Sequence, residues 1–403
     1  MEIYVFVYLP GETIAVPAGL FNYNTDDKTG HFLYGRKYEQ RPNAVPVDPV
    51  SLPLHKEALP TTINEGLYGV LRDSIPDYWG RMVFAAKRDI YPEQVSNIDL
   101  MLDSNGARIG NLDFRSSPDD PEPQLDLPHF STLANIINAA VKIENNEKVS
   151  KEILDLYAQG SSMGGARPKC SVEHDEAMWL VKFPSKNDKA NMPAIEYASM
   201  KLAKLCGIKS AEVLLQKVGT KDVLMVRRFD RQKRGNNWLR NGFMSALSFM
   251  QWDERDRDLW SYYSLAEQMR TYMSVEELKE LYRRMVFNIL INNTDDHPRN
   301  HGFLFDRDSY SLSPAYDILP EIKTAGVSTT SRLAMALGEA GREATIENAL
   351  SSCRLFGWKS REQAMEECVR PMQQIFKDWS EFFESCGVSG EDIKMLESTI
   401  YKT

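Results

Sequence analysis

The segment from Asn293 to Phe303 places a dense run of Asp, Asn and His between two elements that should be regular. Before it, apolar residues recur at helical spacing and predict one buried helix face: Leu278, Leu281, Tyr282, Met285 and Ile289. After it, the short apolar run 303–305 predicts a strand, and a hairpin continues from there toward Asp317. The segment is therefore expected where a buried helix meets a strand, with a second acidic residue carried back by the hairpin.

The acidic and amide residues of this region have a spacing that fits catalysis. Asp295 and Asn300 form the pattern Asp-x4-Asn, and Asp317 follows the hairpin. Phosphoryl transfer needs these groups, because one carboxylate accepts the proton of the attacking hydroxyl while an Asn and a further Asp hold Mg²⁺. The same spacing occurs in the protein-kinase catalytic loop. Asp and Asn are also frequent in turns, so the spacing alone leaves an ordinary turn open.

Two features upstream fit a nucleotide site. Residues 161–169 are rich in Ser and Gly, which lets backbone amides approach phosphate oxygens while Lys169 adds positive charge. The P-loop spacing is absent, and a plain flexible loop would have a similar composition. Lys182 lies in the strand candidate 177–183, and Glu196 comes early in a predicted helix, 194–206. A kinase lysine in such a strand reaches the α- and β-phosphates, although a strand-edge lysine that extends to solvent would fit as well.

Two apolar runs, 213–218 and 223–226, joined by the turn residues 219–222, predict a hairpin. The run from Val226 to Arg231 ends this hairpin at the place of a kinase hinge. Its backbone could bind adenine, and its charges could equally form a solvated face. The order of the features separates these alternatives. A glycine-rich loop, strand lysine, helix glutamate, hinge, Asp-x4-Asn and metal Asp follow one another here as they do in kinases.

The rest of the chain predicts three parts. Frequent Gly, Pro and Asn indicate a β-rich unit at the start, which closes with a helix at about 79–87. Ser274 with Glu277 fits a capping box at the start of the later apolar helix. The polar, proline-rich stretch 116–123 predicts a loop or linker. The predicted parts are an N-terminal β-rich subdomain, 1–115, an ATP-binding lobe, 125–255, and a helical lobe, 256–403.

Composition narrows the classes of protein. The chain has 403 residues, of which 42% are hydrophobic and 26% charged, as in globular proteins with large cores. No apolar run approaches the roughly 20 residues of a membrane helix, and the N-terminus lacks the features of a signal peptide. Five dispersed cysteines without a C-x-x-C pair argue against structural zinc and suit a reducing compartment. We therefore expect a cytoplasmic protein, and its net charge of −9 argues against a surface that binds nucleic acid as a whole.

The motifs together resemble the HipA family of toxin kinases. The resemblance rests on residues 162–169, the Arg-Phe-Asp-Arg core of 226–231, residues 295–300 and residues 312–317. In the N-terminal part, Asp73-Ser-Ile-Pro-Asp-Tyr-Trp-Gly-Arg81 and the stretch 105–112 are also similar to the family. The resemblance covers nearly the whole chain except its last 60 or so residues.

The resemblance implies an α+β fold: a protein-kinase-like, HipA-type two-lobed core with an N-terminal β-rich subdomain and a helical C-terminal lobe. It implies a serine/threonine protein kinase that uses ATP and Mg²⁺, with Asp295 as catalytic base and Asn300 and Asp317 as metal ligands. Ser162 matches the serine that such kinases phosphorylate in themselves to switch off. The residues implied around ATP are Gly164, Gly165, Ala166, Arg167, Pro168, Lys169, Lys182, Arg227, Arg228, Phe229, His297, Pro298, Arg299, Asn300, Tyr316 and Asp317.

The resemblance also implies partners. Family members typically phosphorylate an aminoacyl-tRNA synthetase and pair with a small HipB-like DNA-binding antitoxin, so DNA would be reached only through that antitoxin, and no membrane is involved. Two departures stand out. Arg299 replaces a common lysine before the metal Asn, and Arg167-Pro168 replaces the more usual Gln-Pro or Gln-Glu, which stiffens the glycine loop. Neither removes a group that the mechanism requires.

Two other functions stay open on the residues alone. Related folds phosphorylate lipids or small molecules, which a basic membrane-facing surface would favour. A degenerate kinase that only binds an antitoxin–DNA complex is the second alternative, although Lys182, Asp295, Asn300 and Asp317 are all present.

Overall fold

A computed structural model describes residues 1–55, 57, 60–103, 105–123, 125–161, 163–306, 309–322 and 331–400. The chain forms two compact units and enters each more than once. The first comprises Met1–Asn187, Lys217–Gln251 and Leu304–Asp308, and the second comprises Asp188–Gln216, Trp252–Phe303 and Ser309–Thr403. The division at 1–115, 125–255 and 256–403 stays a prediction.

An antiparallel sheet opens the first unit. Its strands are β1 (Glu2–Tyr8), β2 (Ala15–Asn24), β3 (Thr29–Tyr34) and β4 (Leu112–Arg115), in the order β3-β2-β1-β4. Gly11, with φ +79°, supplies the left-handed residue that turns β1 into β2. The fourth strand pairs with β1, so Val7 lies opposite Leu112. This pairing fixes the stretch that follows helix α4 (Asn97–Asp103) beside the N-terminal strand.

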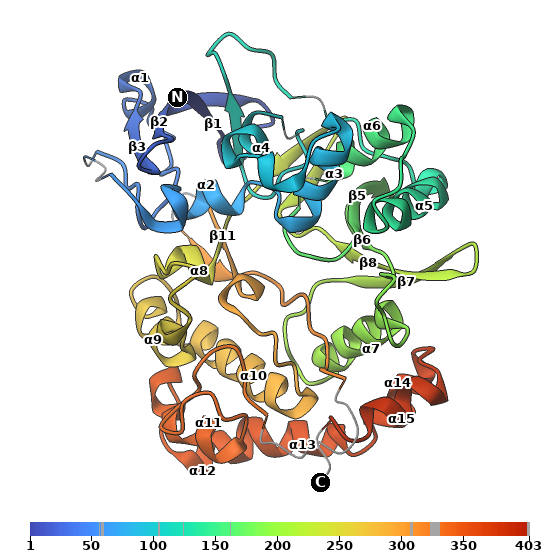
Figure 1. Ribbon diagram of the computed structural model, residues 1–403. Coiled ribbons are helices and arrows are strands. Elements are labelled where there is room, and N and C mark those ends of the chain that lie inside the picture. The colour runs from blue at the N-terminus through green and yellow to red at the C-terminus, as the bar shows by residue number, and fades with distance from the viewer. Residues whose placement is uncertain are drawn as a thin grey trace. The chain divides into compact units, whose positions relative to one another are not determined.

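Helix α3 (Tyr78–Arg88) confirms the helix expected near residues 79–87. Its buried side chains recur at helical spacing, from Trp79 through Val83 to Phe84, and the helix packs against α6 (Lys151–Gly160) (Figure 1). Lys87 and Arg88 lie in its last turn, where cations favour the helix dipole. The other helices of this unit are α1 (Arg36–Glu39), α2 (Gly69–Asp73), α4 (Asn97–Asp103), α5 (Leu133–Glu144) and α8 (Ala246–Phe249), with 3-10 turns at Ile63–Glu65, Pro92–Gln94 and Phe130–Thr132.

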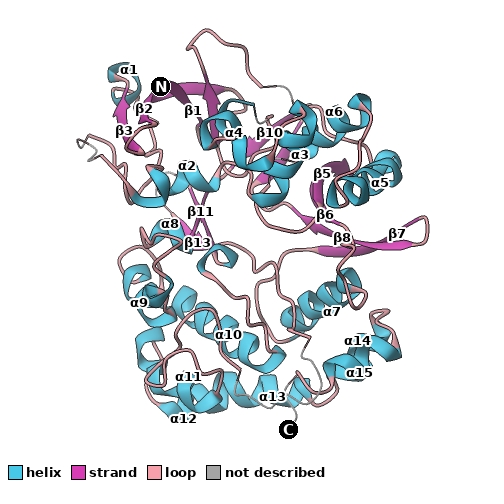
Figure 2. Cartoon of the chain, viewed as in Figure 1, coloured by secondary structure: helices cyan, strands magenta, loops and turns pink. Residues whose placement is uncertain are grey.

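A second sheet carries the glycine-rich segment and the strand lysine. Its strands are β5 (Lys169–His174), β6 (Ala177–Lys182), β8 (Lys221–Arg227) and β7 (Val213–Val218), in the order β5-β6-β8-β7. Helix α6 lies beside β5 (Figure 2). The strand and the hairpin expected from the sequence are confirmed here. The hairpin of β9 (Arg231–Arg234) with β10 (Asn237–Arg240) and the short β11 (Gly242–Ser245) follow.

The second unit is mostly helical. Its helices are α7 (Met192–Leu205), α9 (Tyr262–Met269), α10 (Val275–Ile291), α11 (Ile346–Ser352), α12 (Arg361–Ala364), α13 (Arg370–Phe376), α14 (Trp379–Ser385) and α15 (Gly390–Leu396). Short 3-10 turns lie at Arg257–Leu259, Pro298–Asn300 and Cys353–Phe356, and Met365–Val369 forms a π-helical turn. The hairpin of β12 (Gly302–Phe305) with β13 (Tyr310–Leu312) is also present, and the division between the units falls within β12. In the described parts of the chain, no helix combines the length and the apolar character needed to cross a bilayer.

Helix α10 begins as expected but without the predicted capping box. Ser274 is the N-cap residue, yet its side chain makes no capping hydrogen bond. Glu277 has other partners: it accepts a hydrogen bond from the backbone N–H of Leu312 at 2.8 Å and pairs with Lys209 at 3.2 Å. Tertiary contacts have therefore replaced the local cap, and the glutamate ties α10 to the hairpin that leads to Asp317.

Candidate functional site

The acidic segment follows directly after the C-terminus of helix α10. The helix is buried along most of its length and ends at Asn292, whose left-handed backbone (φ 57°) turns the chain. Asn293 continues the turn, because its backbone N–H donates to the Asn288 carbonyl at 2.9 Å and its side-chain amide to Asn288 Oδ1 at 3.1 Å. The direction in which the chain leaves α10 is therefore fixed two residues before Asp295.

Asp295 and Asn300 are joined by the loop itself. The side-chain amide of Asn300 donates to the Asp295 carbonyl at 2.8 Å, and the Asn300 backbone N–H donates to the His297 carbonyl at 2.8 Å. Because the Asn300 amide nitrogen is used within the loop, its amide oxygen is the atom that it can offer to a cation. The Asp295 side chain is 87% exposed, with His297 Nε2 at 4.0 Å.

Asp317 lies on the same hollow as Asn300. Its backbone is left-handed (φ 59°), which is uncommon for a residue other than glycine and is found often at functional sites. The preceding Tyr316 hydroxyl donates to the Arg299 carbonyl at 2.7 Å, which holds the two segments together. The hollow is lined by Ile208, Arg284, Phe287, Asn288, Asn293, Asp296, Asn300, His301, Ala315, Tyr316, Asp317 and Ile318.

The carboxylates of this region influence one another. Partial loss of solvent raises the pKa of Asp295 above its ordinary value, His297 opposes the rise, and Asp317 adds to it. Because the Asp295 side chain remains largely exposed, water screens these effects and the rise carries little energy. The repulsion between Asp295 and Asp317 is the kind that a bound cation relieves.

These donors fit Mg²⁺ better than a transition metal. Mg²⁺ is held by one or two protein oxygens, with phosphates and water completing its shell. Asn300 and Asp317 supply such a pair from one hollow. Among the described residues, no cluster of three or more His, Cys, Asp or Glu could hold a metal ion. The arrangement therefore suits a metal that arrives with a phosphorylated ligand.

A buried polar network lies directly beneath the exposed acid. Asp296 is 1% exposed and accepts hydrogen bonds from the Tyr262 hydroxyl at 2.6 Å and from the Ala334 backbone N–H at 2.7 Å. The Tyr262 hydroxyl also contacts Asn288 and His301. Burial raises the pKa of Asp296 to about 8 and lowers that of His301 to about 3. No pattern in the sequence singles out Asp296 or Tyr262, and the Asp295-Asp296 pair gives no sign of which carboxylate is buried.

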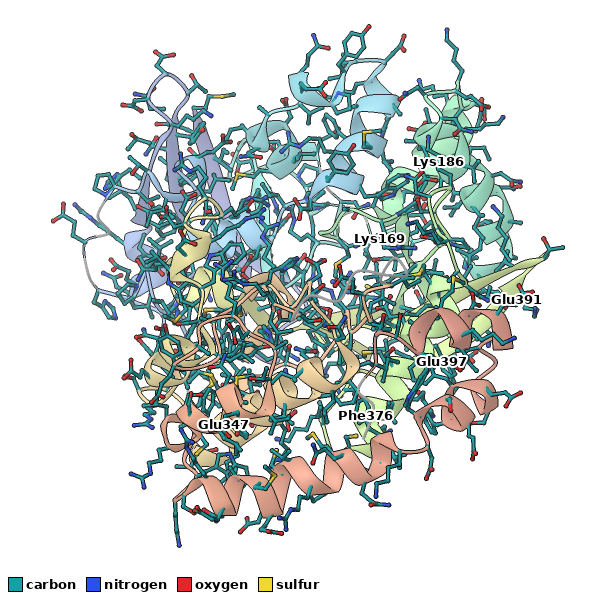
Figure 3. All side chains as sticks on the ribbon, turned by 60° about the horizontal axis from the view of Figure 1, so that its bottom comes forward. Lys169, Lys186, Glu347, Phe376, Glu391 and Glu397 are labelled. Atoms are coloured by element: carbon teal, nitrogen blue, oxygen red, sulfur yellow. The ribbon has the colours of Figure 1, made fainter. Side chains whose placement is uncertain are left out.

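In the first unit, Lys169 at the end of the glycine-rich segment contacts the backbone of the same segment. The Lys169 ammonium donates to the Gly164 carbonyl at 2.7 Å (Lys169 is labelled in Figure 3). Gly165 has φ +110°, a backbone conformation that residues with a Cβ rarely adopt, so this position favours glycine. Lys169 also lies opposite Lys182 on the neighbouring strand, and both are buried. Two adjacent buried cations suit an anionic ligand such as a polyphosphate.

The hinge candidate is part of a structural ion cluster. The Arg228 guanidinium donates to Asp230 at 2.7 and 2.9 Å and to the Ala107 carbonyl, while Arg231 donates to Asp230 at 2.7 Å. Burial alone would raise the pKa of Asp230, but the two arginines outweigh it and hold the pKa well below its ordinary value. Because its side chain is engaged here, Arg228 could contact ATP only through its backbone. Arg227 is exposed at the end of β8, and Phe229 is half-buried.

The predicted pairing of Lys182 with Glu196 and the predicted role of Ser162 both stay predictions. Lys182 ends β6 in the first unit and Glu196 lies in α7 of the second; both are buried, and their pairing stays a prediction. Ser162 lies outside the described residues.

Comparison with known proteins shows the family to which the chain belongs. The family model of the HipA-like C-terminal domain matches residues 161–379, more than half of the chain. The chain belongs to the HipA family. A solved structure of HipA from Shewanella oneidensis MR-1, in complex with HipB and operator DNA, matches with a TM-score of 0.71 over 98% of this chain and 94% of that chain, at 15% identity. At this identity the likeness concerns the fold, and it confirms the mixed α and β, HipA-type, protein-kinase-like class.

Two curated relatives share more limited regions. "Putative kinase Y4dM" of Sinorhizobium fredii is 31% identical over 157 residues, which are 36% of this chain and 37% of that protein. A "Putative kinase" of Haemophilus influenzae is 24% identical over 239 residues, which are 52% of this chain and 66% of that protein. The chain thus spans less than two thirds of the length of each curated relative that it matches.

Proposed function

We propose that this HipA-family protein is an ATP-dependent serine/threonine protein kinase. The observation that carries the proposal is the meeting of Asn300 and Asp317 on one hollow, with Asp295 exposed beside them and electrostatically linked to Asp317. Such a set can hold a metal-bound phosphate and accept a proton at the same place. The kinase names of the two curated relatives support the proposal.

In the proposed mechanism each residue has one role. Asp295 orients the acceptor hydroxyl and takes its proton as the new O–P bond forms and the bond from the γ-phosphorus to ADP breaks. Asn300 and Asp317 would hold Mg²⁺, which when bound supplies positive charge for the phosphate oxygens. Lys169, Lys182 and the backbone N–H groups of 164–167 would bind the phosphates of ATP. Residues 227–229 would contact the adenine through their backbone, and His297 to Arg299 and Tyr316 would complete the ATP-binding set.

We further propose partners of two kinds. The protein substrate is a translation component such as an aminoacyl-tRNA synthetase, as the family resemblance implies. The second partner is a small HipB-like antitoxin, through which the protein would reach DNA. The solved HipA in complex with HipB and operator DNA supports this second partner.

Ser162 is the proposed site of self-inhibition. It is the second residue of the glycine-rich segment 161–169, and a phosphate there would add a charge of about −1.5 to −2. That charge would repel the phosphates of ATP or draw the segment toward nearby arginines. Either effect would lower the affinity for ATP.

Phosphosite mapping tests this function. The purified protein is incubated with Mg-ATP, alone and with a cell extract, and new phosphosites are located by mass spectrometry. We expect phosphoserine or phosphothreonine on at least one other protein, and phosphate on Ser162 together with falling activity. The Asp295→Gln variant serves as the control for contaminating kinases.

Three results would limit or reject the proposal. Phosphate on a lipid or small molecule, with none on protein, would favour the alternative kinase class. Ser162 fully phosphorylated with undiminished activity would reject the inhibitory role alone. No phosphate transferred to any acceptor would reject the kinase proposal and leave a binding protein.

A further inference from the structure

We infer that the first turn of α3, residues 77–80, positions the glycine-rich segment for phosphate binding, so that the N-terminal subdomain helps set the affinity for ATP. The inference rests on the proposed function. It gives a role to the Asp73–Arg81 motif, which the catalytic proposal leaves without one. Four contacts within the first unit carry it.

The first contact joins the backbone of α3 to the middle of the segment. The Trp79 backbone N–H donates to the Gly165 carbonyl at 3.1 Å. This N–H belongs to the first turn of the helix, where backbone donors have no partner inside the helix and usually bond to an N-cap side chain. Asp77 holds the N-cap position, but its side chain makes no capping hydrogen bond. The carbonyl of the glycine-rich segment therefore takes the place of a cap.

The direction of that carbonyl fixes the next amide. In a planar trans peptide, the carbonyl and the following N–H point to opposite sides. Because the Gly165 carbonyl points to α3, the Ala166 N–H is directed away from α3. The contact from Trp79 thus sets the orientation of one of the amides proposed to bind phosphate.

The start of the segment is held by the same turn of α3. The Trp79 indole N–H donates to the Tyr157 hydroxyl at 2.9 Å, and the Ser161 hydroxyl donates to the Tyr157 carbonyl at 2.8 Å. Gly80 allows this close approach, because a Cβ there would lie 2.7 Å from the Ser161 carbonyl oxygen and 2.3 Å from Pro76 Cβ. Helix α3 therefore contacts the segment at both Ser161 and Gly165.

Gly80→Ala is the direct test. The added methyl must displace Ser161 or Pro76, and the loss of the aligned Gly165 carbonyl should weaken Mg-ATP binding by about tenfold, the upper range for one hydrogen bond. Adenosine, which has no phosphates, should bind with unchanged affinity. Both affinities are measured by titration calorimetry on the full chain. The matched control is Gly390→Ala, where a Cβ meets open space, and it should bind both ligands as the wild type does.

Tyr157→Phe provides a second route should Gly80→Ala fail to fold. It removes only the hydroxyl that accepts from Trp79, and we expect Mg-ATP binding to weaken about threefold, as for a modest hydrogen bond, with adenosine unaffected. Equal affinities for Mg-ATP in wild type and both variants, or equal losses for ATP and adenosine, would overturn the inference while leaving the kinase proposal intact. A wild-type protein that binds no Mg-ATP would overturn the proposed function, and this inference with it.

Discussion

Asp295→Gln should lower the rate of phosphoryl transfer by about 10²–10⁴-fold, the usual effect of removing a general base. Gln keeps a hydrogen-bonding side chain but cannot take the proton of the acceptor hydroxyl. Because 87% of the Asp295 side chain is exposed, the substitution should leave the fold and its stability nearly unchanged. The measurement is transfer of radiolabelled γ-phosphate from ATP, with ATP affinity followed separately by calorimetry.

Asp378→Asn is the matched control for this experiment. Asp378 is an exposed aspartate at the start of α14, and its side chain makes no capping hydrogen bond. We expect this variant to transfer phosphate at the wild-type rate. A wild-type rate in Asp295→Gln would show that another group takes the proton. A loss of ATP binding equal to the loss of rate would instead assign Asp295 to nucleotide binding.

Asp230→Ala should have the largest effect on stability. The carboxylate is 1% exposed and bonds to Arg228 and Arg231, and its removal leaves both guanidinium groups buried without their anion. Breaking a buried ion pair in this way destabilises proteins by about 3–5 kcal/mol. The backbone N–H of Gly110, which donates to Asp230 at 2.9 Å, would lose its acceptor as well. Urea unfolding of both proteins measures the change in the free energy of unfolding.

Asp26→Ala controls for the loss of a carboxylate as such. Asp26 is exposed in the turn between β2 and β3, so its replacement should change the free energy of unfolding by less than about 0.5 kcal/mol. If Asp230→Ala were as mild as this control, the ion cluster would contribute little to stability.

Local patterns in the sequence were enough to predict the regular elements around the site. The apolar spacing from Leu278 to Ile289 predicted α10, and the alternation of apolar runs and turn residues predicted β6 and the β7–β8 hairpin. These elements follow from residues close together in the chain, where side-chain periodicity acts directly. The pairing of β4 with β1, more than 100 residues apart, has no such local signal.

Which side chains of the site are buried could not be predicted from the sequence. Asp295 and Asp296 are adjacent and chemically identical, yet one is exposed and the other lies beneath it, bonded to Tyr262 and Ala334. Arg228 was assigned to a hinge because it lies at the end of a predicted hairpin. Its contacts with the carbonyls of Ala107 and Arg108, about 120 residues away in the chain, have no signal in the sequence. The contact of Trp79 with Gly165 is of the same kind.

A crystal structure with Mg²⁺ and a non-hydrolysable ATP analogue tests the central claim most directly. The account predicts one metal ion bound to side-chain oxygens of both Asn300 and Asp317, at about 2.1 Å, and to phosphate oxygens of the nucleotide. Asp295 should then lie on the open side of the γ-phosphate, where an acceptor hydroxyl can approach. A nucleotide whose metal is held by other residues, with Asn300 and Asp317 both uninvolved, would contradict the account.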